Sequence, residues 1–215
     1  ILSVADYMQR QQKKRIPAKE ILNCMIIAYE IQGILALENS FNAVGLDHVI
    51  LVKIASTAVS CRLLDLSFEQ TCNALSHAWL DGQSLRTYRH APNTGSRKSW
   101  AAGDATSRAV RLAFIARTNE MGYHSAITAP RWGFQDCSFD NKPVLLKHQL
   151  DDYVMQNILW KISFPAEFHA QTAVECALQH HENIKSRLDE IERIEIQTQE
   201  AGMRIINKTG PLHNP

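Results

Sequence analysis

Residues 21–37 read ILNCMIIAYEIQGILAL, and apolar side chains recur there on nearly every side of a helix. A helix that is hydrophobic all round has to be surrounded by other elements, so this stretch predicts a helix buried in the core of a helical domain. Pro17 stands where the first turn of a helix tolerates proline, because the N–H missing at that position would be unpaired anyway.

The segments on either side of this stretch also predict helices. Residues 1–14 and 49–64 are expected to be helical, and a capping-box pattern of Ser67 and Gln70 opens a helix over 68–80. Residues 83–100 lack periodicity and predict a long loop, the kind of loop that is more often functional than idle. Apolar residues at helical intervals predict a helix over 104–118, and residues 122–150 are expected to hold short helical turns.

The pattern changes near Phe164. A helix is expected from Pro165 to His181, the polar–apolar alternation over 192–198 predicts a strand, and 200–207 is expected to be helical again. Helix, strand and helix after a purely helical run indicate a second domain. The predicted fold is mainly α, with a large all-helical domain over 1–160 followed over 161–215 by the start of a smaller α/β lid domain.

Composition restricts the partners of the chain. The formal net charge is only +1 in 215 residues, which gives no global argument for nucleic acid or an anionic membrane as a partner. No run reaches the roughly 18 consecutive apolar residues of a membrane span. The five cysteines form no C-x-x-C pair, so we expect reduced thiols in a reducing compartment, either cytoplasm or, in a eukaryote, the mitochondrial matrix.

A dense basic cluster lies between residues 83 and 111. Its basic members are Arg86, Arg89, His90, Arg97, Lys98, Arg108 and Arg111, and Asp104 is its one carboxylate. Arginine offers a planar fork to carboxylates and lysine a point charge, so the cluster suits a small polyanion. A solvated surface loop remains an alternative; nucleic acid is disfavoured because the patch is short and has no interleaved aromatics beyond Tyr88 and Trp100.

Several kinds of chemistry lack their motif. No metal-binding pattern is present, and the neighbouring His180 and His181 point in two directions on a helix. No glycine-rich phosphate loop or nucleophile elbow occurs. Lys98 and His90 could act as acid and base if burial beside other cations lowered their pKa values.

Four long runs make the sequence specific. Residues 85–105 read LRTYRHAPNTGSRKSWAAGDA, 128–134 read TAPRWGF, 164–171 read FPAEFHAQ and 210–215 read GPLHNP. These runs resemble signature segments of the MmgE/PrpD family, and the likeness covers essentially the whole chain. It implies a helical domain with a smaller α/β lid, a homodimer, and dehydration of the tricarboxylate 2-methylcitrate in propionate breakdown without an iron–sulfur cluster or another cofactor.

The resemblance also assigns roles to residues. Lys98 matches a family lysine that faces the active site, Lys161 matches the lysine before the F-P-A box, and His48 lies near an active-site histidine. Glu167 stands where the decarboxylating relatives have histidine, which favours dehydration. We therefore expect Lys98, His90 and Lys161 to be catalytic, and we expect the following to bind substrate: Arg89, Arg97, Arg131 and Glu167, with Arg86 and Arg108 behind them.

Two alternatives remain. The chain could belong to a relative acting on another tricarboxylate, such as a cis-aconitate decarboxylase or an aconitase-like hydratase. It could also be a non-catalytic helical dimerisation fragment. The family has an active-site segment upstream of the position of Ile1 and an acidic-histidine box beyond Pro215, so we expect a piece of a longer protein that is inactive by itself.

Overall fold

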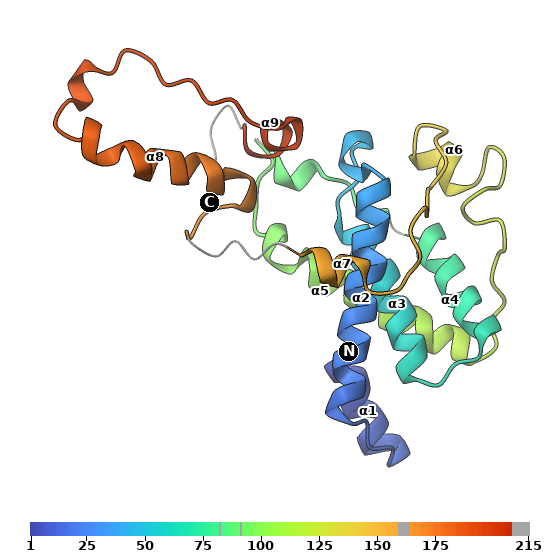
Figure 1. Cartoon of the computed structure of the whole chain (residues 1–215). Helices are drawn as coiled ribbons and strands as arrows, with labels where there is room; N and C mark the ends of the chain where they lie inside the picture. Colours follow the sequence, from blue (N-terminus) through green and yellow to red (C-terminus); the bar gives the residue numbers. More distant parts are fainter. Residues whose placement is uncertain (82, 91, 159–163, 208–215) are drawn as a thin grey trace. The chain divides into compact units, whose positions relative to one another are not determined.

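The structure, a computed structural model, describes residues 1–81, 83–90, 92–158 and 164–207 (Figure 1). The chain divides into two units, residues 1–157 and residues 158–212, and each is described by itself. Within the described residues every regular element is helical, and the β pairing consists of a single antiparallel bridge between Leu46 and Leu85. The predicted mainly α fold is confirmed.

The first unit packs its long helices around α3. Its helices are α1 (Leu2–Gln12), α2 (Ala18–Glu38), α3 (Val49–Leu63), α4 (Phe68–Leu80), α5 (Arg97–Arg117), α6 (Phe134–Ser138) and α7 (Tyr153–Asn157), with one-turn 3-10 helices η1 (Phe41–Val44) and η2 (Thr87–Arg89). Helices α2, α4 and α5 all pack on α3. The predicted boundaries of α3 and α4 agree with these to within a residue.

Helix α3, and not α2, is the element buried on all sides. Most of its residues are inaccessible, including Ile50, Ala55 and Val59. Helix α2 instead leaves Leu22, Met25 and other apolar side chains open, so the prediction that 21–37 is buried all round is wrong. The reason is that α2 packs mainly on α3 and α7, which leaves its opposite side without a neighbour in the described residues.

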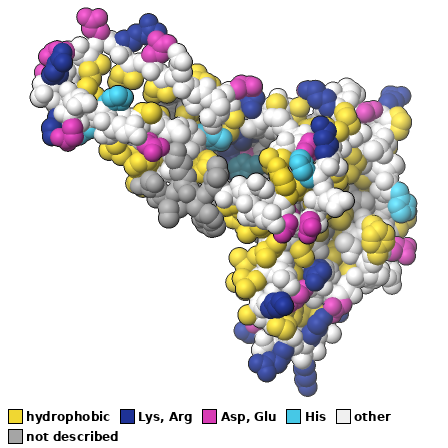
Figure 2. Space-filling view, in the orientation of Figure 1, with side chains coloured by type: hydrophobic (Ala, Val, Ile, Leu, Met, Phe, Trp, Pro, Cys, Tyr) yellow, Lys and Arg dark blue, Asp and Glu magenta, His cyan; other side chains and the backbone are white. Residues whose placement is uncertain are grey.

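Helix α2 has the length and composition of a membrane span, a test that core helices of globular domains also pass. Against a lipid-embedded reading, its central Glu30 is buried within the unit. Hydrophobic side chains are visible at the surface of the region where α1 and α2 lie (Figure 2). The helix therefore presents one face to the protein and an apolar stripe to its surroundings.

The local signals at helix ends were informative for α4 but not for α5. The Ser67 hydroxyl accepts the N–H of Gln70, and the Gln70 side chain accepts the N–H of Ser67, so the predicted capping box is confirmed. Helix α5 begins at Arg97, seven residues before the predicted start at Asp104. Its first turn is largely exposed and so carries no apolar periodicity.

The second unit contains η3 (Phe168–Ala170), α8 (Gln171–Ile184), η4 (Leu188–Glu190) and α9 (Glu200–Ile206). The predicted strand over 192–198 is wrong, because these residues belong to no helix or strand and pair with no other segment in the described part of the chain. Alternation of side chains describes an extended backbone, whereas a strand also needs a hydrogen-bonded neighbour. Helix α8 begins at Gln171 and not at Pro165, after a turn of 3-10 helix.

A buried carboxylate fastens α7 to α2. The two oxygens of Glu30 accept the N–H groups of Val154 and Met155 at 3.0 and 2.7 Å, in the first turn of α7. A Cβ atom added at Gly33, one turn further along α2, would lie 2.5 Å from the Val154 side chain. Glu30 and Gly33 together let the backbone of α7 lie against α2.

Replacing Glu30 by alanine should therefore lower the free energy of unfolding by about 2–3 kcal/mol, because hydrogen bonds to a charged acceptor are lost and two N–H groups lose their partner. Glu30→Gln keeps one carbonyl oxygen and should lose less. Urea unfolding and amide hydrogen exchange at 153–157 measure both effects. An alanine variant no less stable than Glu120→Ala, an exposed-site control, would contradict this role.

Candidate functional site

The segment before α3 is joined to the basic loop by backbone hydrogen bonds. The Asp47 N–H donates to the Ser84 carbonyl at 2.7 Å, and the Arg86 N–H donates to the Gly45 carbonyl at 2.9 Å. The bridge between Leu46 and Leu85 lies between them. These contacts place the start of the basic loop on the N-terminal end of α3.

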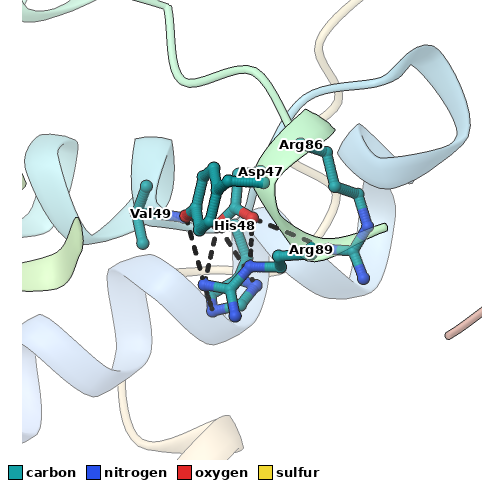
Figure 3. A network of polar contacts seen from close by, with 6 residues as sticks. Asp47, His48, Val49, Arg86 and Arg89 are labelled. Atoms are coloured by element: carbon teal, nitrogen blue, oxygen red, sulfur yellow. Dashed lines mark hydrogen bonds and ion pairs between the residues drawn. The ribbon is translucent and has the colours of Figure 1, made fainter. Parts of the chain in front are cut away.

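The Asp47 carboxylate is the centre of this junction (Figure 3). Its side chain is fully buried, and it accepts the N–H of Val49 at 3.1 Å in the first turn of α3. Arg89 donates two hydrogen bonds to this carboxylate, from Nε to Oδ2 and from Nη2 to Oδ1. Nη1 of Arg86 lies 3.8 Å from Oδ2. Two arginines from η2 and the residue before it thus converge on one carboxylate.

The charge state of Asp47 follows from these contacts. Burial alone would raise its pKa, but hydrogen bonds from Arg89 and the Val49 N–H, with the attraction of His48 and Arg89, outweigh burial and hold the pKa below its ordinary value. The carboxylate is therefore ionised at neutral pH. An ionised, bidentate partner fixes the guanidinium plane of Arg89.

His48 lies beside the same group. Its Nδ1 is 3.5 Å from Asp47 Oδ1, and Nη2 of Arg89 is 3.5 Å from its Nε2. Although 61% of the His48 side-chain surface is accessible, partial desolvation by the surrounding residues lowers its pKa, repulsion from Arg89 and Arg86 lowers it further, and the attraction of Asp47 opposes both. An imidazole with a lowered pKa is neutral at physiological pH and can accept a proton.

Arg97 and Lys98, the first two residues of α5, face different surroundings. The Arg97 guanidinium lies 4.3 Å from the Trp100 ring centroid and 5.6 Å from that of Tyr88, and its Nη2 donates to Asp104 at 3.1 Å. Lys98 is exposed. His90 directly follows η2 and is half-buried. The structure thus gathers four of the predicted residues, Arg89, His90, Arg97 and Lys98, on η2 and the start of α5.

A cavity of about 430 Å³ opens beside this segment. Its lining contains Lys53 of α3, Arg97 and Arg108 of α5 and the Tyr88 ring, and its one carboxylate is Asp104. Of the described residues that were predicted to act in the site, Arg97 and Arg108 line it. Lys53 is the residue that sequence reasoning missed, although a lysine within the apolar run 49–59 was a usable signal.

Lys53 is buried, with 2% of its surface exposed, and its ammonium donates to the Asp81 carbonyl at the end of α4. Burial lowers its pKa to about 8, the Asp81 carboxylate opposes the shift, and Arg108 adds to it. Arg108 itself bridges Asp104 and Asp81, at 3.2 and 3.7 Å. Charged groups of α3 and α5 and the Asp81 carboxylate, directly after α4, thus interact beside the cavity.

Arg131 does not line this cavity. Arg131 is exposed with φ +68°, in a turn where a Cβ on Gly133 would lie 2.6 Å from the backbone of Ala129. This turn delivers Phe134 to the core, against Trp79, so the run 128–134 has a packing role. Glu167, in the second unit, caps η3 by accepting the N–H of His169. Lys161 lies outside the described residues.

Metal chemistry has no evident centre in the described part of the chain, where no three His, Cys, Asp or Glu side chains gather as ligands would. All five cysteines are free thiols. The polar groups that do converge are cations with a few carboxylates. Such an arrangement can hold an anion and, through His48, His90 or Lys53, exchange a proton.

Replacing Asp47 by asparagine should lower the free energy of unfolding at pH 7 by about 3–5 kcal/mol, because Arg89 loses a buried ionic partner. The folded-state pKa of Asp47 lies below the unfolded value, so its stabilisation is complete above about pH 4 and is lost as pH falls through the folded pKa. Wild type and variant should therefore converge in acid. A gap independent of pH, or no larger than that of the exposed-site control Asp151→Asn, would contradict this reading.

Family models and curated relatives both match this chain. The MmgE/PrpD N-terminal domain matches residues 1–146, and the MmgE/PrpD C-terminal domain matches residues 164–215. The chain is 58% identical over 222 residues to 2-methylcitrate dehydratase of Escherichia coli strain K12, covering all of this chain and 46% of that protein. It is 59% identical to the Cupriavidus necator and the mitochondrial Yarrowia lipolytica 2-methylcitrate dehydratases, covering 46% and 43% of their lengths. The chain spans less than half the length of these relatives, and it belongs to the MmgE/PrpD family.

Proposed function

We propose that the protein carrying this chain eliminates water from 2-methylcitrate, giving 2-methyl-cis-aconitate, as a step of propionate breakdown. The observation that carries the proposal is the 58–59% identity, over the whole chain, to three proteins named 2-methylcitrate dehydratase. The cationic cavity supports it, because the substrate has three carboxylates to neutralise.

The reaction requires three chemical roles from side chains of the protein. A base takes a proton from the carbon next to a carboxylate, an acid protonates the leaving hydroxyl, and cations stabilise the enolate-like charge that develops in between. We assign acid–base work to Lys98, His90 and Lys161. Arg97, Arg89, Arg131 and Glu167 remain our candidates for holding the substrate; a guanidinium carries five N–H donors, so the bond to Asp47 does not use all of those of Arg89. No cofactor is part of the proposal.

The domain arrangement and the compartment belong to the same proposal. We place the helical domain at 1–160 and the start of the lid at 161–215, supported by the two described units. Free thiols and the mitochondrial name of the Yarrowia relative support a reducing compartment, cytoplasm in a bacterium or the mitochondrial matrix in a eukaryote.

The full-length protein should form a conjugated alkene from 2-methylcitrate, followed by ultraviolet absorbance. Lys98→Ala or His90→Ala should lower kcat by about 10²–10⁴-fold, the usual range for loss of an acid–base group. Lys142→Ala, which alters an exposed lysine in a turn, should leave kcat unchanged.

The same assay separates the alternatives. Carbon dioxide release from cis-aconitate, without alkene formation from 2-methylcitrate, would replace dehydration by decarboxylation. Glu167→His would then be expected to raise that release, because histidine occupies this position in decarboxylating relatives. A folded full-length protein that binds and turns over neither acid would indicate a non-catalytic module.

We further propose that the protein is a homodimer and that α2 supplies part of the contact. Exposed apolar residues of α2 recur at helical spacing, at Leu22, Met25, Ile26 and Tyr29. Such a stripe is unusual on a surface that faces only water.

Sedimentation of the full-length protein tests this contact. Met25→Glu should shift the protein from dimer to monomer, since a charge would be buried without a partner. The matched control is Leu188→Glu, which changes an exposed leucine of the second unit. A Met25→Glu protein that remains dimeric would remove α2 from the interface.

A further inference from the structure

Lys53 occupies a place where an ammonium group is costly. It projects from α3, the most enclosed helix of the first unit, and only 2% of its surface is exposed. Taking an ammonium out of water is unfavourable unless partners compensate for it. Its bond to the Asp81 carbonyl meets part of that need.

The surroundings of Lys53 disfavour the charged form of its side chain. Burial is the largest influence on the Lys53 ammonium, repulsion from Arg108 adds to it, and the Asp81 carboxylate offsets them only in part, so the pKa lies at about 8. The folded pKa is below the unfolded value, so charged Lys53 destabilises the fold below pH 8. Groups that reduce stability at a cavity wall are typical of functional sites.

The cavity has an excess of positive charge. Among its charged lining residues, Lys53, Arg97 and Arg108 are basic and Asp104 is acidic. Asp104 is shared between Arg97 and Arg108, at 3.1 and 3.2 Å, and Asp81 faces Arg108 at 3.7 Å. The volume of about 430 Å³ lies within the range of small-ligand sites. A polycarboxylate in this space would supply the missing negative charge.

We propose that this cavity is a carboxylate subsite of the substrate-binding site and that Lys53 pairs there with one carboxylate of the substrate. The inference rests on the proposed function, because it takes the hydroxy-tricarboxylate as the ligand. It adds to the predicted residues a binding residue, Lys53, that lies more than 40 positions before Lys98 in the sequence. Lys53 and Arg97 would hold carboxylates while the acid–base groups act on the carbon skeleton.

Lys53→Met in the full-length protein tests the assignment. Methionine has a similar shape, so the variant should fold, with a midpoint of thermal unfolding equal to or above that of wild type. The KM for 2-methylcitrate should rise by about 10- to 100-fold, the loss expected for a charge-assisted contact, whereas kcat should change much less. Lys142→Met is the matched control and should leave KM unchanged.

The pH dependence gives a readout that a purely structural lysine would not move. Wild-type KM should rise by about tenfold per unit above pH 8 as Lys53 loses its proton, and the variant should show no such rise. The other charged groups beside Lys53 are the Asp81 and Asp104 carboxylates and the guanidinium groups of Arg97 and Arg108. Burial raises the pKa of Tyr88 above its ordinary value, so Tyr88 stays protonated.

The outcomes are distinguishable. Wild-type turnover with an unchanged KM in Lys53→Met, or a variant that only loses thermal stability, would overturn the subsite and leave the proposed function standing. No wild-type turnover, but calorimetric binding of 2-methylcitrate that Lys53→Met abolishes, would support the subsite and remove the reaction. Neither turnover nor binding would overturn both.

Discussion

The buried carboxylate of Asp47 is the contact on which the site depends. It closes the first turn of α3 through the Val49 N–H, and it holds Arg89 and Arg86 of the basic loop. Together with the backbone pairing of 45–47 with 84–86, this contact fixes the basic loop beside the start of α3. The loop in turn determines where Tyr88 and Arg97 line the cavity. A buried ion pair adds little net stability by itself but penalises every arrangement that separates its partners, which suits a loop that has to hold one conformation.

The charges of the first unit thus have two different uses. Hydrogen bonds from Arg89 and the Val49 N–H lower the pKa of Asp47, so its carboxylate is ionised and has a structural role. Burial and repulsion from Arg108 lower the pKa of Lys53 to about 8, so its charged form lowers the stability of the fold. Asp47 orients the basic loop, and Lys53 lines the cavity where we propose that a tricarboxylate binds. In this proposal, positioning is carried by Asp47, just before α3, and binding by Lys53 within α3.

The parts of the fold that were predictable from sequence are those decided by local signals. The Ser67–Gln70 capping box located α4, and the small and apolar residues of 49–64 located α3. The start of α5 was missed because its first turn is exposed, and the strand over 192–198 failed because alternation cannot supply a pairing partner. The site was harder still: Asp47 and Arg89 lie 42 residues apart, and one sequence does not show which carboxylate a distant arginine meets. The basic loop was recognisable by charge alone, whereas the place of Lys53 became evident only when residues of α3, α5 and the basic loop were seen to line one cavity.

The central claim is that this cavity receives the carboxylates of the substrate. A crystal structure of the full-length protein with tricarballylate, which has the three carboxylates of the substrate but no hydroxyl to lose, tests it most directly. A ligand carboxylate should lie within hydrogen-bonding distance, about 2.7–3.2 Å, of Lys53 Nζ, and a second one should lie near Arg97. A ligand bound elsewhere, with the cavity between α3 and α5 filled only by water, would contradict it.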